Sequence, residues 1–205
     1  MTPRRAQAKN LKRKTANRPE RKTVVIFCEG KASEPDYIDG LKQLPNVRSN
    51  TSVNIEVDLH QGVPQTLAQL AIGRKADDEV DECWCVFDVE WPKKHPNLTQ
   101  AIQLARDHNI RLAISNPCFE LWLILHFEDQ TAFLDTDETE SRSRKLDGRS
   151  DKRINAEQYM PRRHKAAQRA SSLSCRHERD QTPFPHDNPS STMSDLLKAI
   201  SAMEP

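Results

Sequence analysis

Residues 23–30 read TVVIFCEG and residues 84–90 read WCVFDVE, and these two stretches decide the fold of the chain. Each is a short apolar run rich in β-branched or aromatic residues, which is typical of a buried strand in an α/β sheet. Each run ends in acidic residues, which are out of place inside such a sheet. Because the carboxyl ends of parallel strands line one crevice where ligands bind, Glu29, Asp88 and Glu90 are expected to converge on one hard cation.

Outward from these stretches, strands and helices alternate along the chain. Strands are expected at 23–28, 53–57, 83–88 and 111–115, and helices at 33–44, from Pro64, from Leu98, from about Pro117, at 157–173 and after 191. Ser33, Asn97 and Ser191 or Thr192 are the expected helix caps. This alternation predicts an α/β fold, a three-layer and mostly parallel sheet with helices on both faces, plus a helical C-terminal extension.

Charge sets the first 22 residues apart from the rest of the chain, in which two further parts are expected. Residues 1–22 carry nine basic residues and one acid, so this arm holds +8 and the remainder −7 within a net charge of +1. The arm is expected to be disordered, either as a contact to a phosphate backbone or as a solubilising leader. Residues 23–127 are expected to form the catalytic core. Residues 128–205 are expected to be a basic helical extension that packs on the core, with a loop, an insertion or a weak helical piece at 128–156.

Composition excludes several classes of protein. No apolar run in the 205 residues approaches the roughly 18 residues of a membrane span, and no signal-like leader is seen, so a cytoplasmic protein without a membrane partner is expected. Five cysteines without framework spacing argue against a disulfide protein. The sequence also lacks a P-loop, so the chain is not expected to hydrolyse ATP by itself.

The three acids suit magnesium chemistry. Asp88 and Glu90 are two residues apart and lie on the same side if the strand continues. Mg²⁺, with Mn²⁺ as a substitute, needs few carboxylates when a substrate phosphate completes its oxygen shell. Glu29 would serve as a ligand or a general base beside Gly30, where the backbone can approach a phosphate. Glu120, near the start of a helix, is the next candidate.

Each of these residues also has a purely structural interpretation. Acids at strand ends commonly cap the next helix or pair with a nearby lysine, here Lys31, Lys93 or Lys94. Glu120 could instead pair with Arg111 or His126. His126, on an apolar helix, is interpreted as a core histidine rather than as a catalyst.

In the two acidic stretches and in several later motifs, the sequence resembles the RloB-like family of bacterial defence proteins. The matching pieces are VIFCEG at 25–30, SEPDY at 33–37, VFDVE at 86–90, NPCFELWL at 116–123 with HF at 126–127, and NPSST at 188–192. The family is similar to Toprim domains, which have a glutamate after the first strand and Asp-x-Asp after a later one. Glu29 and Asp88 match that pattern, whereas Glu90 stands where a second aspartate is expected and is one methylene longer. Glu34 also matches the family pattern.

The resemblance implies a Toprim-like fold and a metal-dependent nuclease of an anti-phage, abortive-infection system, controlled by a partner ATPase encoded nearby. Glu29, Asp88 and Glu90 would hold the metal, and Glu29, Glu34 and Glu120 would be catalytic. Nucleic acid, DNA or RNA, would be held by basic side chains: Lys31, Lys93, Lys94, Arg162, Arg163 and Lys165. The alternatives are a non-catalytic subunit that binds nucleic acid or the ATPase, and a primase-like nucleotidyl-transfer enzyme. A homo-oligomer is left open.

Overall fold

The computed structural model describes residues 22–49, 53–58, 60 and 62–203. The basic arm predicted at 1–22 therefore lies outside the described residues, except for Lys22. That lysine begins the first strand and forms an ion pair with Glu82, with 2.9 Å between Nζ and Oε1.

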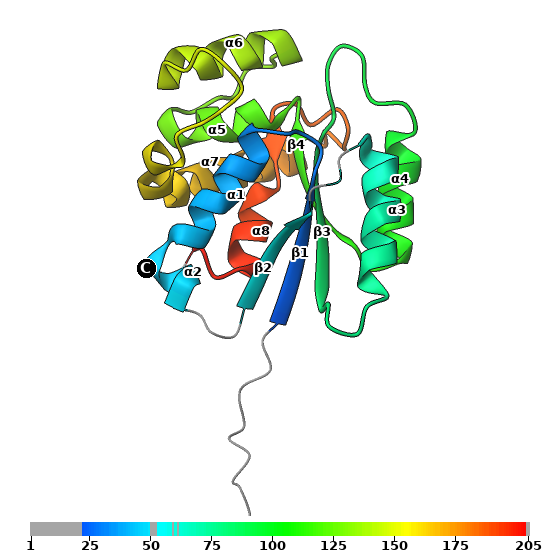
Figure 1. Cartoon of the computed structure of the whole chain (residues 1–205). Coiled ribbons are helices and arrows are strands. Elements are labelled where there is room, and N and C mark those ends of the chain that lie inside the picture. Colours follow the sequence, from blue (N-terminus) through cyan, green and yellow to red (C-terminus); the bar gives the residue numbers. More distant parts are fainter. Residues whose placement is uncertain (1–21, 50–52, 59, 61, 204–205) are drawn as a thin grey trace, which may run out of the picture.

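A five-stranded, mostly parallel sheet forms the centre of the molecule (Figure 1). The strands β1 (Lys22–Cys28), β2 (Val53–Asp58), β3 (Glu82–Asp88) and β4 (Arg111–Asn116) are parallel, and β5 (Ser190–Ser191) pairs antiparallel with β4. The spatial order is β2-β1-β3-β4-β5. The four predicted strands are confirmed, whereas the two-residue β5 is too short to leave a pattern in the sequence.

Helices cover both faces of the sheet, as predicted. One face is covered by α1 (Ser33–Gln43), α2 (Pro45–Ser49), α5 (Phe119–Phe127), α7 (Arg163–Arg179) and α8 (Met193–Ala199), and the other by α3 (Pro64–Lys75) and α4 (Leu98–Asp107). The helix α6 (Thr136–Asp147) lies beyond α5, and two 3₁₀ turns, Ala156–Gln158 and Met160–Arg162, precede α7. This three-layer α/β arrangement is consistent with a Toprim-like fold.

Alternation along the strands creates two separate cores. Val24 and Ile26 of β1 face the α1–α5 side, whereas Val25 and Phe27 face α3 and α4. Since successive strand side chains point to opposite faces, an uninterrupted apolar run is what a sheet covered on both sides requires. Burial of each such side chain contributes about 1.5–3 kcal/mol.

Helices α7 and α8, which follow residue 128, belong to one of these cores. The same cluster that contains the strand residues Val24 and Ile26 also contains Ala166 and Ala170 of α7 and Leu196 and Leu197 of α8.

Among the described residues, no helix is both long enough and apolar enough to cross a membrane.

Several local predictions need correction. Ser33 is the first residue of α1 rather than its cap, and its hydroxyl donates to Glu34 at 3.0 Å. Asn97 precedes α4 in a left-handed conformation (φ 61°), and its side chain does not cap the helix. The chain turns further than expected after β4, because α5 begins at Phe119 rather than near Pro117. The polar stretch 128–156 contains a regular helix, α6, which starts with a capping box of Asp135 and Glu138.

The interpretation of His126 as a core residue is confirmed. Its Nδ1 lies 2.8 Å from the carbonyl oxygen of Trp122 and its Nε2 lies 3.0 Å from the hydroxyl of Tyr37. Nδ1 therefore carries the proton, and Nε2 accepts from the tyrosine. Burial lowers the pKa of His126 to about 3, so the ring is neutral at physiological pH.

Two glycines in helices give opposite predictions. A Cβ at Gly40 of α1 would overlap the Cβ of Ala156, whereas a Cβ at Gly73 of α3 meets nothing within 4 Å. Gly40→Ala should lower the free energy of unfolding by about 1–3 kcal/mol because of overpacking. Gly73→Ala should raise it by about 0.5–1 kcal/mol because alanine loses less backbone entropy in a helix. Urea unfolding of both variants measures this, and a Gly40→Ala protein as stable as wild type would refute the packing.

Candidate active site: a cavity lined by carboxylates

The strand order places a crevice between β1 and β3. From the end of β1 the chain crosses through α1 to β2 on one side, and from the end of β3 it crosses through α4 to β4 on the other side. Two crossovers that leave in opposite directions open a gap at the carboxyl ends of the two strands, which is where open α/β sheets bind ligands. Glu29 directly follows β1, and Asp88 is the last residue of β3.

A cavity of about 350 Å³ lies at this position. Its wall includes six carboxylates, which come from four segments of the chain: Glu29, Glu34, Asp88, Glu90, Glu120 and Glu140. Two lysines, Lys31 and Lys152, also line it. All five acids predicted from the sequence therefore meet at one site, and Glu140 of α6 joins them.

Glu29 connects the ends of the two strands. Its Oε2 accepts a hydrogen bond from the backbone N–H of Asp88 at 3.1 Å, and its own N–H donates to the Val86 carbonyl at 3.0 Å. Because the backbone fixes its carboxylate across the crevice, Glu29 faces the same cavity as Asp88.

Glu90 reaches the cavity by a different path from the one expected. The strand does not continue past Asp88; instead Glu90 has a left-handed backbone (φ 63°), and its N–H donates to the Pro117 carbonyl at 2.8 Å. A non-glycine residue rarely adopts this conformation. Asp88 and Glu90 line the same cavity, but a tight turn and not strand periodicity brings them together.

Glu34 is buried in the first turn of α1, with 4% of its surface exposed. Its carboxylate accepts from the Gly30 N–H and from the Ser33 hydroxyl, both at 3.0 Å. A Cβ at Gly30 would overlap this carboxylate, so the close approach requires glycine there. Burial raises the pKa of Glu34, the charge of Glu120 adds to the increase, and the hydrogen bonds oppose it.

The surroundings of Asp88 disfavour its charged form. Burial raises its pKa well above the ordinary range, and the charges of Glu34, Glu120 and Glu29 raise it further; the N–H of Phe119 at the start of α5 acts in the opposite direction. Its Oδ1 is inaccessible to solvent and has no hydrogen-bond partner in the described structure. An ionised carboxylate in such a place needs a cation.

Three basic side chains contact the acidic cluster, and none of them was expected as a partner. His95 Nε2 lies 2.7 Å from Glu29 Oε1 and 3.9 Å from Glu90 Oε1. The close contact with Glu29 raises the pKa of His95, burial opposes this, and the charges of Glu29 and Glu90 add to the increase. Arg149 pairs with Glu120 at 3.6 Å, so neither Arg111 nor His126 is the partner of that acid.

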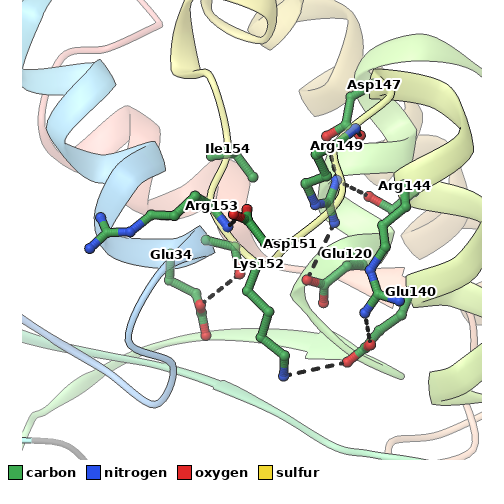
Figure 2. A network of polar contacts seen from close by, with 12 residues as sticks. Glu34, Glu120, Glu140, Arg144, Asp147, Arg149, Asp151, Lys152, Arg153 and Ile154 are labelled. Carbon is green, nitrogen blue, oxygen red and sulfur yellow. Dashed lines mark hydrogen bonds and ion pairs between the residues drawn. The ribbon is translucent and has the colours of Figure 1, made fainter.

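Arg149 and Lys152 come from one loop, residues 148–155, between α6 and the first 3₁₀ turn (Figure 2). Arg149 is buried between Glu120 and Asp147, while Lys152 extends toward Glu140 with 3.7 Å between Nζ and Oε1. Arg153 fixes the far end of the loop to Asp36 of α1 at 2.6 Å. The loop therefore brings positive charge to one wall of the cavity.

The basic residues predicted to hold nucleic acid are not gathered at the cavity. Of the six, Lys31 lines it. Lys93 is exposed, and Lys94 lies over the ring of Trp91 with Nζ 4.3 Å from its centroid. Arg162 and Arg163 lie at the start of α7 and bond to backbone carbonyls, Gln158 and Ala202 respectively, while Lys165 is exposed.

The donor set fits a divalent cation. Among the described residues, no three acidic, histidine or cysteine side chains already surround a single point as metal ligands do. The cavity nevertheless offers several of the carboxylate oxygens that Mg²⁺ prefers, and the orphaned Oδ1 of Asp88 lies among them. Glu29, Asp88 and Glu90 are the residues that would hold the ion.

Sequence reasoning missed three contributors: His95, Glu140 and Arg149 as the partner of Glu120. None lies in a motif. His95 follows Asp88 in an irregular segment, and the other two lie in the polar stretch whose structure the sequence left open.

The burial of Asp88 gives a stability prediction in metal-free buffer. Since its pKa is higher in the folded than in the unfolded protein, the folded state binds the proton more tightly. The stability contributed by this group therefore falls as the pH rises above about 4, the unfolded pKa. Asp88→Asn, which mimics the protonated acid, should stabilise the protein by about 1–3 kcal/mol at pH 8.

Thermal unfolding in EDTA from pH 4 to pH 8 measures this effect, and the advantage of the variant should shrink toward about pH 4. Asp78→Asn, at an exposed turn after α3, is the matched control and should be neutral. A destabilised Asp88→Asn protein at pH 8 would show that the carboxylate is favourably solvated.

Comparison with known proteins agrees with the resemblance in the sequence. The family model described as "RloB-like protein" matches residues 24–200, which is most of the chain. Searches of the curated proteins and of the solved structures find no match. With the fold and the carboxylate cavity contained in the matched range, the chain belongs to the RloB-like family.

Proposed function

We propose that this protein is a Toprim-like, Mg²⁺-dependent nuclease that hydrolyses phosphodiester bonds at the carboxylate cavity. One observation carries the proposal: Glu29 and Asp88, at the carboxyl ends of two neighbouring strands, meet at the topological switch point with Glu90 beside them. The pattern of a glutamate after the first strand and two acids after a later one matches Toprim domains. Glu90 keeps the charge of the second acid on a longer side chain.

The site would bind the cation through residues that the fold has already positioned. Glu29 is fixed by the N–H of Asp88, and Asp88 is the carboxylate whose buried oxygen lacks a partner. A bound Mg²⁺ would neutralise charge developing on the phosphate and lower the pKa of an attacking water. Glu90, with 44% of its side chain exposed, is the ligand best able to adjust.

Two further acids would handle protons. Glu34 has a raised pKa and lies on the cavity wall, which suits a group that accepts the proton of the attacking water. Glu120 is held by Arg149 on the neighbouring wall. The water oxygen would form the new bond to phosphorus, the bond from phosphorus to the leaving oxygen would break, and that oxygen would take up a proton.

Lysines would hold the substrate against the repulsion of the acids. Lys31 and Lys152 line the cavity, and Lys152 has 72% of its side chain exposed, so it is free to turn from Glu140 toward a phosphate. The proposal includes either DNA or RNA as substrate.

The biological setting of the proposal comes from family membership. Members of the family are associated with restriction loci and with a partner ATPase, so we propose an anti-phage role in which the ATPase controls cleavage. Mn²⁺ would replace Mg²⁺ in vitro. The cytoplasm, where these nucleic acids and ATP are found, is the compartment that fits this role.

A second candidate is a non-catalytic subunit that binds nucleic acid or the ATPase. The observation that favours it is the pairing of three cavity acids with basic side chains: Glu29 with His95, Glu120 with Arg149 and Glu140 with Lys152. Acids that stay paired would form a structural network and not a reactive centre.

Cleavage assays separate the two candidates. The purified protein is incubated with single-stranded DNA, duplex DNA and total RNA, with and without the partner ATPase and ATP, in Mg²⁺, Mn²⁺ or EDTA. We expect metal-dependent cleavage that falls on the order of 100-fold or more in Asp88→Asn and Glu29→Gln, because each removes a ligand charge. Asp78→Asn should retain full activity.

A folding control accompanies the assay. At a concentration 100 times its dissociation constant, Mg²⁺ should raise the free energy of unfolding of wild type by about 2.7 kcal/mol, and the melting temperature should rise accordingly. Both increases should vanish in Asp88→Asn. Nucleic-acid binding without cleavage in every condition would favour the non-catalytic subunit. Cleavage that persists in EDTA or in Asp88→Asn would contradict the metal site.

A further inference from the structure

An exposed group of aromatic side chains lies next to the carboxylate cavity. Trp91 and Phe133 contact each other edge to face with 5.6 Å between ring centroids, and the His186 ring lies 6.2 Å from Trp91. Lys94 covers part of the indole, with Nζ 4.3 Å from the Trp91 centroid. We call Trp91, Phe133, His186 and Lys94 the aromatic platform.

Phe133 leaves more than half of its surface, 57%, in solvent. It is the most exposed of the three large apolar side chains, with Val63 and Phe184, that stand out among the described residues. The other tryptophans, Trp84 and Trp122, are almost fully buried. Exposed aromatic rings cost solvation free energy, so a cluster of them marks a binding surface more often than a random surface feature.

Buried amide groups hold the platform in place. Asn116, which is fully buried at the end of β4, accepts from the Trp91 indole N–H at 2.7 Å and donates to the Pro185 carbonyl and the Asp187 carboxylate at 3.1 and 2.9 Å. Asn188 bonds in both directions to the backbone of Leu134, next to Phe133. Three segments distant in sequence are thus fastened so that their rings meet.

The platform is joined directly to the cavity. Trp91 follows Glu90, a cavity residue, and its N–H donates to the Thr136 hydroxyl at 3.0 Å while its carbonyl accepts from the Thr136 N–H at 3.1 Å. Thr136 itself lines the cavity. The backbone that carries Trp91 is therefore continuous with the wall of the cavity and bonded to it at Thr136.

A nucleobase is the ligand that matches these features. Its flat face stacks on an aromatic ring, and the phosphates beside it are attracted by Lys94 and by the exposed Lys93. Bases inside a duplex have both faces covered by neighbouring bases, so only an unpaired base can stack here.

We infer that the aromatic platform binds an unpaired nucleobase adjacent to the phosphate in the carboxylate cavity, so that the substrate is a single strand or an unpaired loop. This inference rests on the proposed nuclease function and deepens it by naming the substrate class. Phe133 provides the main stacking face, Trp91 supports it, and Lys94 contacts the backbone.

Binding measured in EDTA tests the platform without cleavage. The full chain is titrated with a short single-stranded oligonucleotide, as DNA and as RNA, with a matched oligonucleotide that contains abasic positions, and with the duplex. We expect the intact strand to bind on the order of 10-fold more tightly than the abasic strand and the duplex, because stacking on an aromatic ring is lost in both. Comparison of the DNA and RNA arms identifies the sugar preference.

Substitutions at Phe133 separate an aromatic face from general apolar surface. Phe133→Leu should weaken binding of the intact strand on the order of 10-fold and leave the abasic strand unchanged, whereas Phe133→Tyr should bind as wild type does. Phe184→Leu is the matched control at an exposed phenylalanine outside the platform. Binding should also quench tryptophan fluorescence through Trp91, because Trp84 and Trp122 are buried.

The results distinguish the platform from the nuclease. Equal affinity of Phe133→Leu and wild type for the intact strand, or equal losses with intact and abasic strands, would refute base stacking even if Asp88→Asn abolishes cleavage. Binding that depends on the bases and on Phe133, together with no metal-dependent cleavage, would refute the nuclease and leave the platform in place. Failure of wild type to bind any oligonucleotide would refute the platform and favour a protein partner for this surface.

Discussion

Mutual repulsion among buried and half-buried carboxylates is the constraint on which the candidate site depends. Glu29, Glu34 and Glu120 all raise the pKa of Asp88, whose Oδ1 is sealed from solvent without a partner. Folding of the sheet alone does not require this arrangement, since acids at strand ends are usually solvated. A fold that keeps acids together against their repulsion loses stability there, and such a loss is typical of functional sites.

The surrounding elements reduce the electrostatic free energy that keeping these carboxylates together costs. Glu34 and Glu120 lie in the first turns of α1 and α5, where helix dipoles favour negative charge. His95 and Arg149 contact the cluster at its two sides. These partners belong to segments that connect the secondary-structure elements, so a ligand could displace a side chain without disturbing the sheet. The aromatic platform follows the cavity residue Glu90 along the chain. Its rings are partly exposed, and hydrogen bonds to the buried amides of Asn116 and Asn188 hold them in place.

The candidate site can be predicted from the sequence because the ends of the strands are visible in it. Residues 24–28 and 83–87 are apolar throughout, so each following acid falls at a strand terminus by position alone, and parallel pairing then brings Glu29 and Asp88 together. The helix that carries Glu34 is equally clear from its apolar spacing. Glu90 was expected beside Asp88 because the strand was expected to continue. It lies beside Asp88 because of a left-handed turn, which is held by a hydrogen bond to Pro117 on another segment.

The sequence by itself determined the sheet, its two apolar faces and the strand-end position of two of the acids, because periodicity and burial are local properties of a chain. Only the tertiary structure decided the partners of those acids. His95, Arg149 and Lys152 reach the cavity through irregular segments, whose paths depend on contacts such as Arg153 with Asp36, across 117 residues. The aromatic platform likewise joins residues 91, 133 and 186, because packing and not spacing brings such distant side chains together.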